Sequence, residues 1–290
     1  MMDFFKYRKL SYMASSFLIV MTILFIFFKG LNLGIDFKGG FNVEVRSDLS
    51  NQELTNIFSR IDTSREVIVK KEISSNVYSV RIESGIGDKL FLDSLKESVS
   101  TLINIEILMS EYIEPTFSSD LIQNAIYALL SSIFVIALYI WIRFDWQFAF
   151  AGILALLHDV FISIGFMSIF NIEFNLTMIA AILLIAGYSI NDTIVLFDRL
   201  RTLSSEEDVK INLPSMINKS IILNLRRTIL TSFTTILALI CLVILAPVNL
   251  TEMPIVFIFG VLIGTYSSIF LGLPMIHALN YESVLKSRDS

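Results

Sequence analysis

Apolar residues along this chain gather into six long runs, separated by more polar stretches. The runs cover residues 11–28, 122–142, 147–170, 174–197, 229–246 and 254–277. A helix needs about 20 mostly apolar residues to cross the hydrocarbon core of a bilayer, and these runs have roughly that length. The pattern predicts a polytopic α-helical membrane protein with six transmembrane helices, the first at 11–28 and helices 2 to 6 within 121–280.

The stretch between the first two runs, residues 29–120, has a different pattern. Alternating and helical spacings follow one another in it, and Ser50 with Glu53 forms the sequence signature of a helix capping box. We expect strands at 40–47, 65–73, 76–84 and 104–113, and helices at 50–61 and 87–103. The order β-α-β-β-α-β predicts a ferredoxin-like α+β domain between transmembrane helices 1 and 2.

The positions of Lys and Arg predict the orientation, because these residues are enriched in cytoplasmic loops. Outside 29–120, a long domain that the rule largely exempts, they lie mainly in three segments, which we expect to be cytoplasmic: 1–10, 198–228 and 281–290. The short connections 171–175 and 247–253 contain neither residue. We therefore place both termini in the cytoplasm and the domain at 29–120 in the periplasm. Glu173, in a short outer connection, is expected to be solvated.

Composition narrows the classes of function. The chain is 54% hydrophobic and 17% charged, and its net charge is −5 without a cluster of basic residues. Nucleic-acid binding is therefore unsupported. The single cysteine, Cys241, cannot form an internal disulfide and has no metal-ligand spacing. We expect neither a metal nor a cofactor. The first run lacks a small-x-small cleavage site, so we interpret it as an uncleaved anchor.

Two aspartates, Asp159 and Asp192, lie inside membrane-length apolar runs. A charged side chain at the bilayer centre costs about 2.5–3.5 kcal/mol on insertion scales. Intramembrane carboxylates are therefore candidates for proton or ion sites, each with a partner nearby.

Asp192 has a candidate partner in Arg227, at the start of the fifth run. Counting inward from Asp198 at ~1.5 Å per residue, Asp192 lies roughly 9 Å deep, and the Arg227 side chain reaches a similar depth. Desolvation favours the neutral acid and the guanidinium favours the carboxylate, so small changes in helix spacing can move a proton. The alternative is a static ion pair. Polar residues on the same helices are candidate supports: Asn191, Thr193 and Thr231.

Asp159 lies near the midplane beside His158. A His–Asp pair can relay protons, because imidazole titrates near neutral pH. Alternatively, neighbouring residues on a helix point in different directions, and His158 is then a packing residue. Small residues on the fourth and sixth runs predict close helix packing. They are Ala180, Ala181, Ala186 and Gly187 on the fourth, and Gly260 and Gly264 on the sixth.

Two other classes of function stay open. An intramembrane aspartyl protease needs two carboxylates close together. Depth argues against it, since Asp159 lies roughly 18 Å and Asp192 roughly 9 Å from the cytoplasmic side, and the stretch that ends in Asp192 reads GYSIND instead of G-x-G-D. A small-molecule exporter would need larger outer domains than the single short unit at 29–120.

Four motifs resemble one family. GLNLGIDFKGG follows the first run, HDV lies in the third, GYSINDTIVLFDRLR ends the fourth, and RRTILTS opens the fifth. Together they resemble the SecD/SecF family of bacterial preprotein translocation, and over nearly the whole chain they resemble its smaller, SecF-type subunits. The first motif contributes Gly34, Asp36, Gly39 and Gly40. The chain departs from the family's V-G-P-x-x-G stretch at IEPTFSSDL, which keeps Pro115 but neither glycine.

The resemblance implies half of a transporter of the resistance-nodulation-division type, with SecD supplying six further helices. It implies a non-enzymatic subunit of the bacterial inner membrane that uses the proton-motive force in late steps of protein export. Asp192 and Arg227 are then the proton-site residues. The implied partners are SecD, the channel of SecY, SecE and SecG, YajC, and the translocating preprotein.

Overall fold

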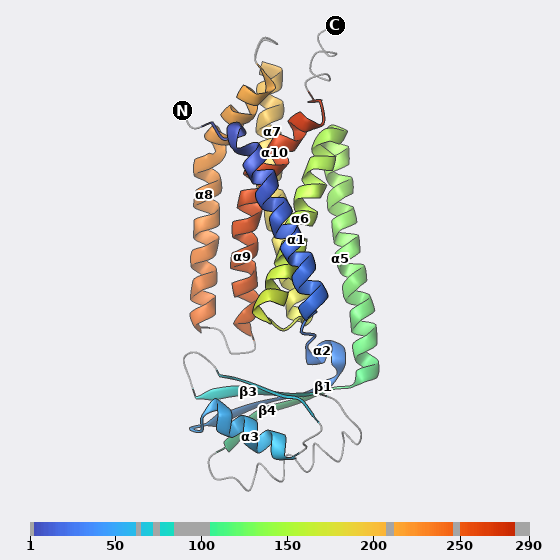
Figure 1. Ribbon diagram of the computed structural model, residues 1–290, viewed down its shortest axis with the longest axis vertical. Coiled ribbons are helices and arrows are strands. Elements are labelled where there is room, and N and C mark those ends of the chain that lie inside the picture. The colour runs from blue at the N-terminus through green and yellow to red at the C-terminus, as the bar shows by residue number, and fades with distance from the viewer. Residues whose placement is uncertain are drawn as a thin grey trace.

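The structure is a computed structural model that shows a helical bundle with a small sheet at one end (Figure 1). It describes residues 3–61, 65–71, 76–83, 105–206, 212–245 and 250–281. Within these residues, six helices are long and apolar enough to cross a membrane. The predicted six-helix membrane fold is confirmed. The start of α1 and the end of α10 lie at the end of the bundle opposite the sheet (Figure 1).

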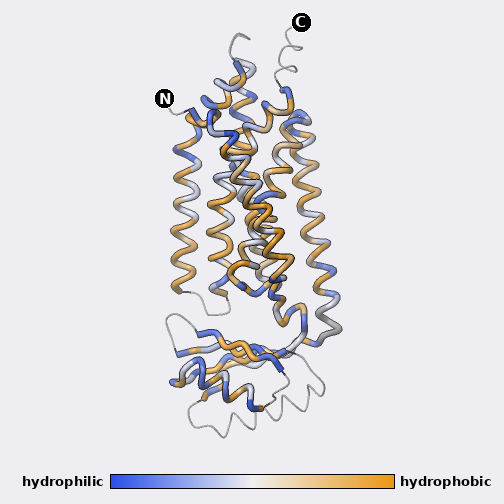
Figure 2. Tube along the Cα trace, in the orientation of Figure 1, coloured by the Kyte–Doolittle hydropathy of each residue, from blue (hydrophilic) through white to orange (hydrophobic). Residues whose placement is uncertain are grey.

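The helices of the bundle exceed the predicted apolar runs at several ends. Their bounds are α1 Arg8–Lys29, α5 Pro115–Arg143, α6 Trp146–Phe170, α7 Leu176–Glu206, α8 Leu213–Leu245, α9 Glu252–Ser267 and α10 Leu273–Ala278. A 3-10 turn, Phe5–Tyr7, precedes α1, and a π-helical segment, Ser268–Gly272, joins α9 to α10. Figure 2 shows apolar positions along most of the length of these helices.

The stretch 198–228, which we expected to be a loop, is mainly helical. α7 continues to Glu206 and α8 begins at Leu213. At ~1.5 Å per residue both helices are longer than the ~30 Å hydrocarbon core. Their extensions are amphipathic and pack together, because Leu203 of α7 and Met216 of α8 belong to one buried cluster. Charge ended the apolar run in the sequence, but it did not end the helix.

Three helices form the centre of the bundle. α6, α7 and α9 bury half or more of their apolar windows, whereas α1, α5 and α8 leave most of theirs exposed. Close approach depends on glycine: Gly260 lies directly against Ile185, and a Cβ on Gly264 would lie 3.0 Å from Cβ of Ser189. The predicted close packing at these two glycines is confirmed.

In its described residues, the outer domain is a four-stranded antiparallel sheet with a helix. Its elements are β1 Gly40–Ser47, α3 Asn51–Ile61, β2 Val67–Lys71, β3 Val77–Glu83 and β4 Ile105–Ile113. The strand order β2-β3-β1-β4, with every neighbouring pair antiparallel, is that of the ferredoxin-like unit. The helix expected at 87–103 lies outside the described residues. Leu54 and Phe58 of α3 pack on Val43 and its neighbours in the sheet.

Two short sequence motifs in this domain have a clear structural role. The backbone N–H of Ser50 donates to Oε2 of Glu53 at 2.8 Å, and the N–H of Glu53 donates to Oγ of Ser50 at 3.4 Å, so the capping box is confirmed. Gly39 and Gly40, which lead from the short helix α2 (Ile35–Lys38) into β1, have φ values of 78° and 152°. Such values favour glycine and explain these two motif residues.

Candidate functional site

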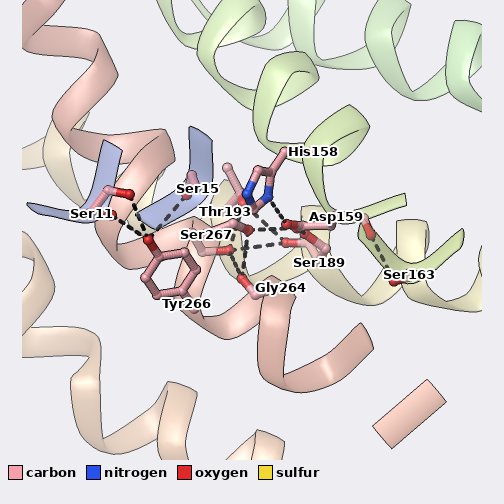
Figure 3. Close-up of polar contacts among 11 residues, drawn as sticks. Ser11, Ser15, His158, Asp159, Ser163, Ser189, Thr193, Gly264, Tyr266 and Ser267 are labelled. Atoms are coloured by element: carbon pink, nitrogen blue, oxygen red, sulfur yellow. Dashed lines mark hydrogen bonds and ion pairs between the residues drawn. The ribbon is translucent and has the colours of Figure 1, made fainter. Parts of the chain in front are cut away.

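Asp159 lies at the centre of the bundle, where α6 meets α7 and α9 (Figure 3). Its side chain is 0% exposed. Ser189 of α7 donates to Oδ2 of Asp159 at 2.5 Å, and Ser267 of α9 donates to the same oxygen at 2.6 Å. A buried carboxyl group needs such partners, and two neighbouring helices provide them.

His158 completes this cluster. Its Nδ1 lies 2.8 Å from Oδ1 of Asp159, so the two side chains meet although they are neighbours on one helix. Nε2 of His158 is buried and has no hydrogen-bond partner among the described residues. An imidazole with one nitrogen on a carboxylate and the other unoccupied can accept or release a proton.

The polar cluster continues along α7 toward the π-helical segment. Oγ1 of Thr193 lies 2.9 Å from Oγ of Ser268, and it also donates to the carbonyl of Ser189 at 3.1 Å. Ser268 donates in turn to the carbonyl of Gly264. π-helical turns inside longer helices are frequent at functional sites. Ser189 and the serine pair Ser267–Ser268 lie inside apolar runs and gave no signal in the sequence.

Asp192 lies on the same segment of α7, next to Thr193. It is buried, and its Oδ2 has no hydrogen-bond partner among the described residues. The expected partner, Arg227, is exposed and lines a cavity of about 420 Å³ together with Asp198 and Asn224. The two side chains form no ion pair within 4.0 Å, but the guanidinium acts on the carboxyl group through space.

The three supporting residues differ in their surroundings. Only Thr193 joins the cluster around Asp159. Asn191 is exposed on α7. Thr231 donates to the carbonyls of Arg227 and Thr228 in its own helix, both at 3.0 Å, and such bonds satisfy a hydroxyl locally.

The two intramembrane acids do not form a shared carboxyl site. Asp159 is bonded to serine and histidine side chains, and no hydrogen bond joins it to Asp192. Two carboxyl groups that share a proton must be in direct contact. The structure therefore lacks the geometry that the protease alternative requires, and the two acids can act only as separate sites.

The glycine motif after the first helix binds the connection between α6 and α7. The N–H of Gly34 donates to the carbonyl of Phe174 at 2.8 Å, and the N–H of Phe174 donates to the carbonyl of Asn32 at 2.7 Å. Oδ2 of Asp36 accepts from the N–H of Leu176, the first residue of α7, at 2.9 Å. The motif thus attaches the outer segment to the helix that carries Asp192.

Glu173 is not solvated, and our expectation for it was wrong. Its side chain is only 2% exposed, and Oε2 contacts Nη1 of Arg81 and, at 3.3 Å, Nζ of Lys70. The outer domain covers the connection that contains Glu173 and supplies both cations. A pair 92 positions apart leaves no local pattern in a sequence.

Two known protein families together match most of the chain. The family described as "Protein export membrane protein SecD/SecF, C-terminal" matches residues 93–282, and the "SecD/SecF GG Motif" family matches residues 24–48. The protein translocase subunit SecF of Rickettsia rickettsii is 35% identical over 280 residues, which cover 94% of this chain and 90% of that protein. The SecF of Borreliella burgdorferi is 35% identical over 289 residues, covering 94% and 96%.

Solved structures show the same fold. SecDF from Thermus thermophilus, described as a translocon-associated membrane protein, superposes with a TM-score of 0.84 at 31% identity over 96% of this chain. A SecDF structure in a super-membrane-facing form gives a TM-score of 0.71 at 28% identity over the full chain. This chain spans only 38% and 40% of those two longer chains. From the family matches, the identities and the shared fold, we conclude that this chain belongs to the SecD/SecF family of protein export membrane proteins.

Proposed function

We propose that the chain is an accessory subunit of the Sec protein translocase that couples proton movement through the membrane to protein export. The observation that carries the proposal is Asp192, a buried acid with an unpartnered oxygen, under the charge of Arg227. Protonation changes the charge of this site, and the cost of burying that charge depends on how α7 and α8 are spaced. A proton that crosses the membrane releases ~2.3 kcal/mol per 100 mV, which is enough to bias such a helix movement.

Asp159 is proposed as the second, deeper proton site on the same route. Ser189 of α7 and Ser267 of α9 hold its carboxyl group, so a change in its charge alters the contact between these two helices. His158 is the group that can pass a proton to it or take one away. The chain makes and breaks no covalent bond in this scheme, and its function is mechanical.

A SecD-type partner is proposed to cover one face of α7. Ala180, Leu184, Gly187 and Asn191 are exposed along this face at helical spacing, and a Cβ on Gly187 would meet nothing within 4 Å. Small residues with one polar side chain are typical of contacts between membrane helices. The SecDF chains contain a further portion that this chain does not match.

The remaining partners and the orientation are proposed from the family and from charge. The partners are the SecY, SecE and SecG channel, YajC and the exported preprotein, and the membrane is the bacterial inner membrane. Arg143 and Asp198 pair at the end of the bundle where α1 begins, and basic residues gather there. The positive-inside rule places this end, with both termini, in the cytoplasm.

The test is Asp192→Asn in membranes reconstituted with SecD and the channel. Export of a preprotein is measured with ATP alone and with an added proton gradient. We expect the variant to keep ATP-driven export and to lose the stimulation by the gradient. Asp198→Asn, an exposed acid on the same helix, is the matched control and should keep both. Full gradient stimulation in Asp192→Asn would refute the proposal.

A further inference from the structure

Four charged side chains join the outer domain to the membrane helices. Arg81 of β3 and Lys70 of β2 come from the sheet, and Glu173 and Glu252 come from the starts of the α7 and α9 regions. Arg81 pairs with Glu173, and Lys70 contacts Glu173 at 3.3 Å and Glu252 at 2.7 Å. We call these four residues the charge network.

Burial makes this network sensitive to position. Glu173 and Arg81 are almost fully buried, whereas Arg46 and Glu106, which form an exposed pair within the same sheet, are 58% and 64% exposed. A buried charge that loses its partner is strongly unfavourable, while exposed pairs contribute little. The network therefore favours one docked position of the sheet and penalises a displacement that separates the charges.

The surroundings of Glu173 are shaped to hold it. A Cβ on Gly34 would lie 2.7 Å from Oε1 of Glu173, so the absence of a side chain there makes room for the carboxylate. A cavity of about 150 Å³ borders Glu173 and Arg81, and Asn42 and Asn175 also line it. The docked arrangement is thus part of the packing and not an incidental surface contact.

The membrane residues of the network begin the two helices that hold the buried acid cluster. Glu173 stands three residues before Leu176, where α7 begins, and Glu252 is the first residue of α9. Further along, these two helices supply Ser189 and Ser267, the hydroxyl donors to Asp159. A movement of α7 against α9 near Asp159 would therefore also displace Glu173 and Glu252, the two residues that contact the sheet.

We propose that the charge network is an electrostatic latch that transmits movements of α7 and α9 to the outer domain. The inference rests on the proposed proton-coupled function and identifies the residues that carry its mechanical output. Glu173 is a positioning residue in this mechanism, because its contacts are with the sheet and not with Asp159 or Asp192. Arg81 and Lys70 are its counterparts on the domain.

A distance measurement tests the latch without any gradient. Spin labels are placed at Asn56 of α3 and Ile255 of α9, both exposed, in a full-length chain in which Cys241 is replaced by Ser. In liposomes with the SecD partner, we expect one narrow distance distribution. Arg81→Glu should broaden it, and combining that change with Glu173→Arg should restore it. Arg46→Glu, a reversal in the exposed pair, should leave it narrow.

An export assay tests the transmission in the same variants. We expect Arg81→Glu to reduce gradient-stimulated export by about tenfold, because the buried Glu173 then faces a second carboxylate and keeps only its 3.3 Å contact with Lys70, and the charge swap to recover it. Lys70→Met, at a more exposed site that risks less of the fold, should give a smaller loss. The proposal is overturned if Arg81→Glu keeps the narrow distribution, or broadens it while export stays fully stimulated.

The two proposals fail in different ways. Full stimulation in Asp192→Asn would refute proton coupling at that residue, whereas the label distances would still decide whether the charges hold the sheet. A loss of stimulation in Asp192→Asn together with unchanged distances in Arg81→Glu would keep proton coupling and refute the latch.

Discussion

The carboxylate of Asp36 accepts a hydrogen bond from the backbone N–H of Leu176 at 2.9 Å, across 140 positions of the chain. Leu176 begins α7, so the glycine motif that follows α1 caps the helix that carries Asp192. The first residues of a helix have N–H groups without partners within the helix, and an acid there is favourable for the helix dipole as well. The motif therefore has a structural reason to contain an acid at this position.

Replacing Asp36 with Ala should weaken this cap. The loss of a capping side chain costs about 1 kcal/mol, and we expect a lower midpoint of thermal unfolding for the full chain in detergent. Asp120→Ala, at an exposed acid of α5, is the control and should leave the midpoint within error. Equal midpoints for both variants would show that the bond to Leu176 contributes nothing to stability.

Gly34→Ala should lower the stability of the protein more than the addition of one methyl group suggests. The added methyl group would lie 2.7 Å from Oε1 of Glu173 and 3.1 Å from Cβ of Asn175, so the segment must shift. Overpacking of this kind costs about 1–3 kcal/mol. Gly187→Ala is the comparison, since nothing lies within 4 Å of that position and alanine favours a helix by about 1 kcal/mol. In the chain without its partner, the midpoint of thermal unfolding should fall for Gly34→Ala and rise for Gly187→Ala.

The sequence was sufficient to predict the elements whose pattern is local. Spanning helices must satisfy their backbone within the membrane and be apolar along their length, so runs of hydrophobic residues identify them. The strands of the outer domain and the Ser50–Glu53 box were likewise visible in short windows. The end of α7 was misplaced, because the charged residues from Asp198 onward mark the membrane surface and not the end of the helix.

The interactions that sequence reasoning missed join residues from distant elements. Ser189 and Ser267 lie in apolar runs where a serine is unremarkable, and only the approach of α9 at Gly264 brings them to one carboxylate. Glu173 sits in a short polar connection that resembles any solvated loop, and its pairing with Arg81 follows from the docking of the domain. The acids inside apolar runs could be identified as candidate sites because burying a charge there is costly. Of the partners that the structure gives Asp159, His158 was expected and the two serines were not.

The capping box of α3 predicts a dependence on pH. The backbone N–H and the hydroxyl of Ser50 donate to Glu53 and hold the pKa of its carboxyl group below the ordinary value of 4.5. A lowered folded-state pKa contributes stability that is fully present above the ordinary pKa and is lost as the pH falls through the folded value. Glu53→Gln removes this titration. We therefore expect hydrogen exchange at the first turn of α3 to converge between wild type and Glu53→Gln as the pH falls below 4.5. A difference that stays constant with pH would contradict this.

Removing one hydroxyl donor from Asp159 should destabilise the bundle, because a carboxyl group with 0% exposure depends on protein donors for its hydrogen bonds. A hydrogen bond to a charged group contributes about 1.5–3 kcal/mol and a neutral one about 1 kcal/mol, so Ser267→Ala measures the charge that the carboxyl group carries in the resting protein.

Ser163→Ala is the matched control: this serine is also buried on α6, but it donates only to the backbone carbonyl of Asp159. Denaturant unfolding of both variants gives the difference. A loss that exceeds that of the control by about 0.5–2 kcal/mol indicates an ionised Asp159. Equal losses would show a neutral Asp159, and a loss smaller than that of the control would show that Ser267 is a packing residue and would remove the α9 contact from the proposed proton route.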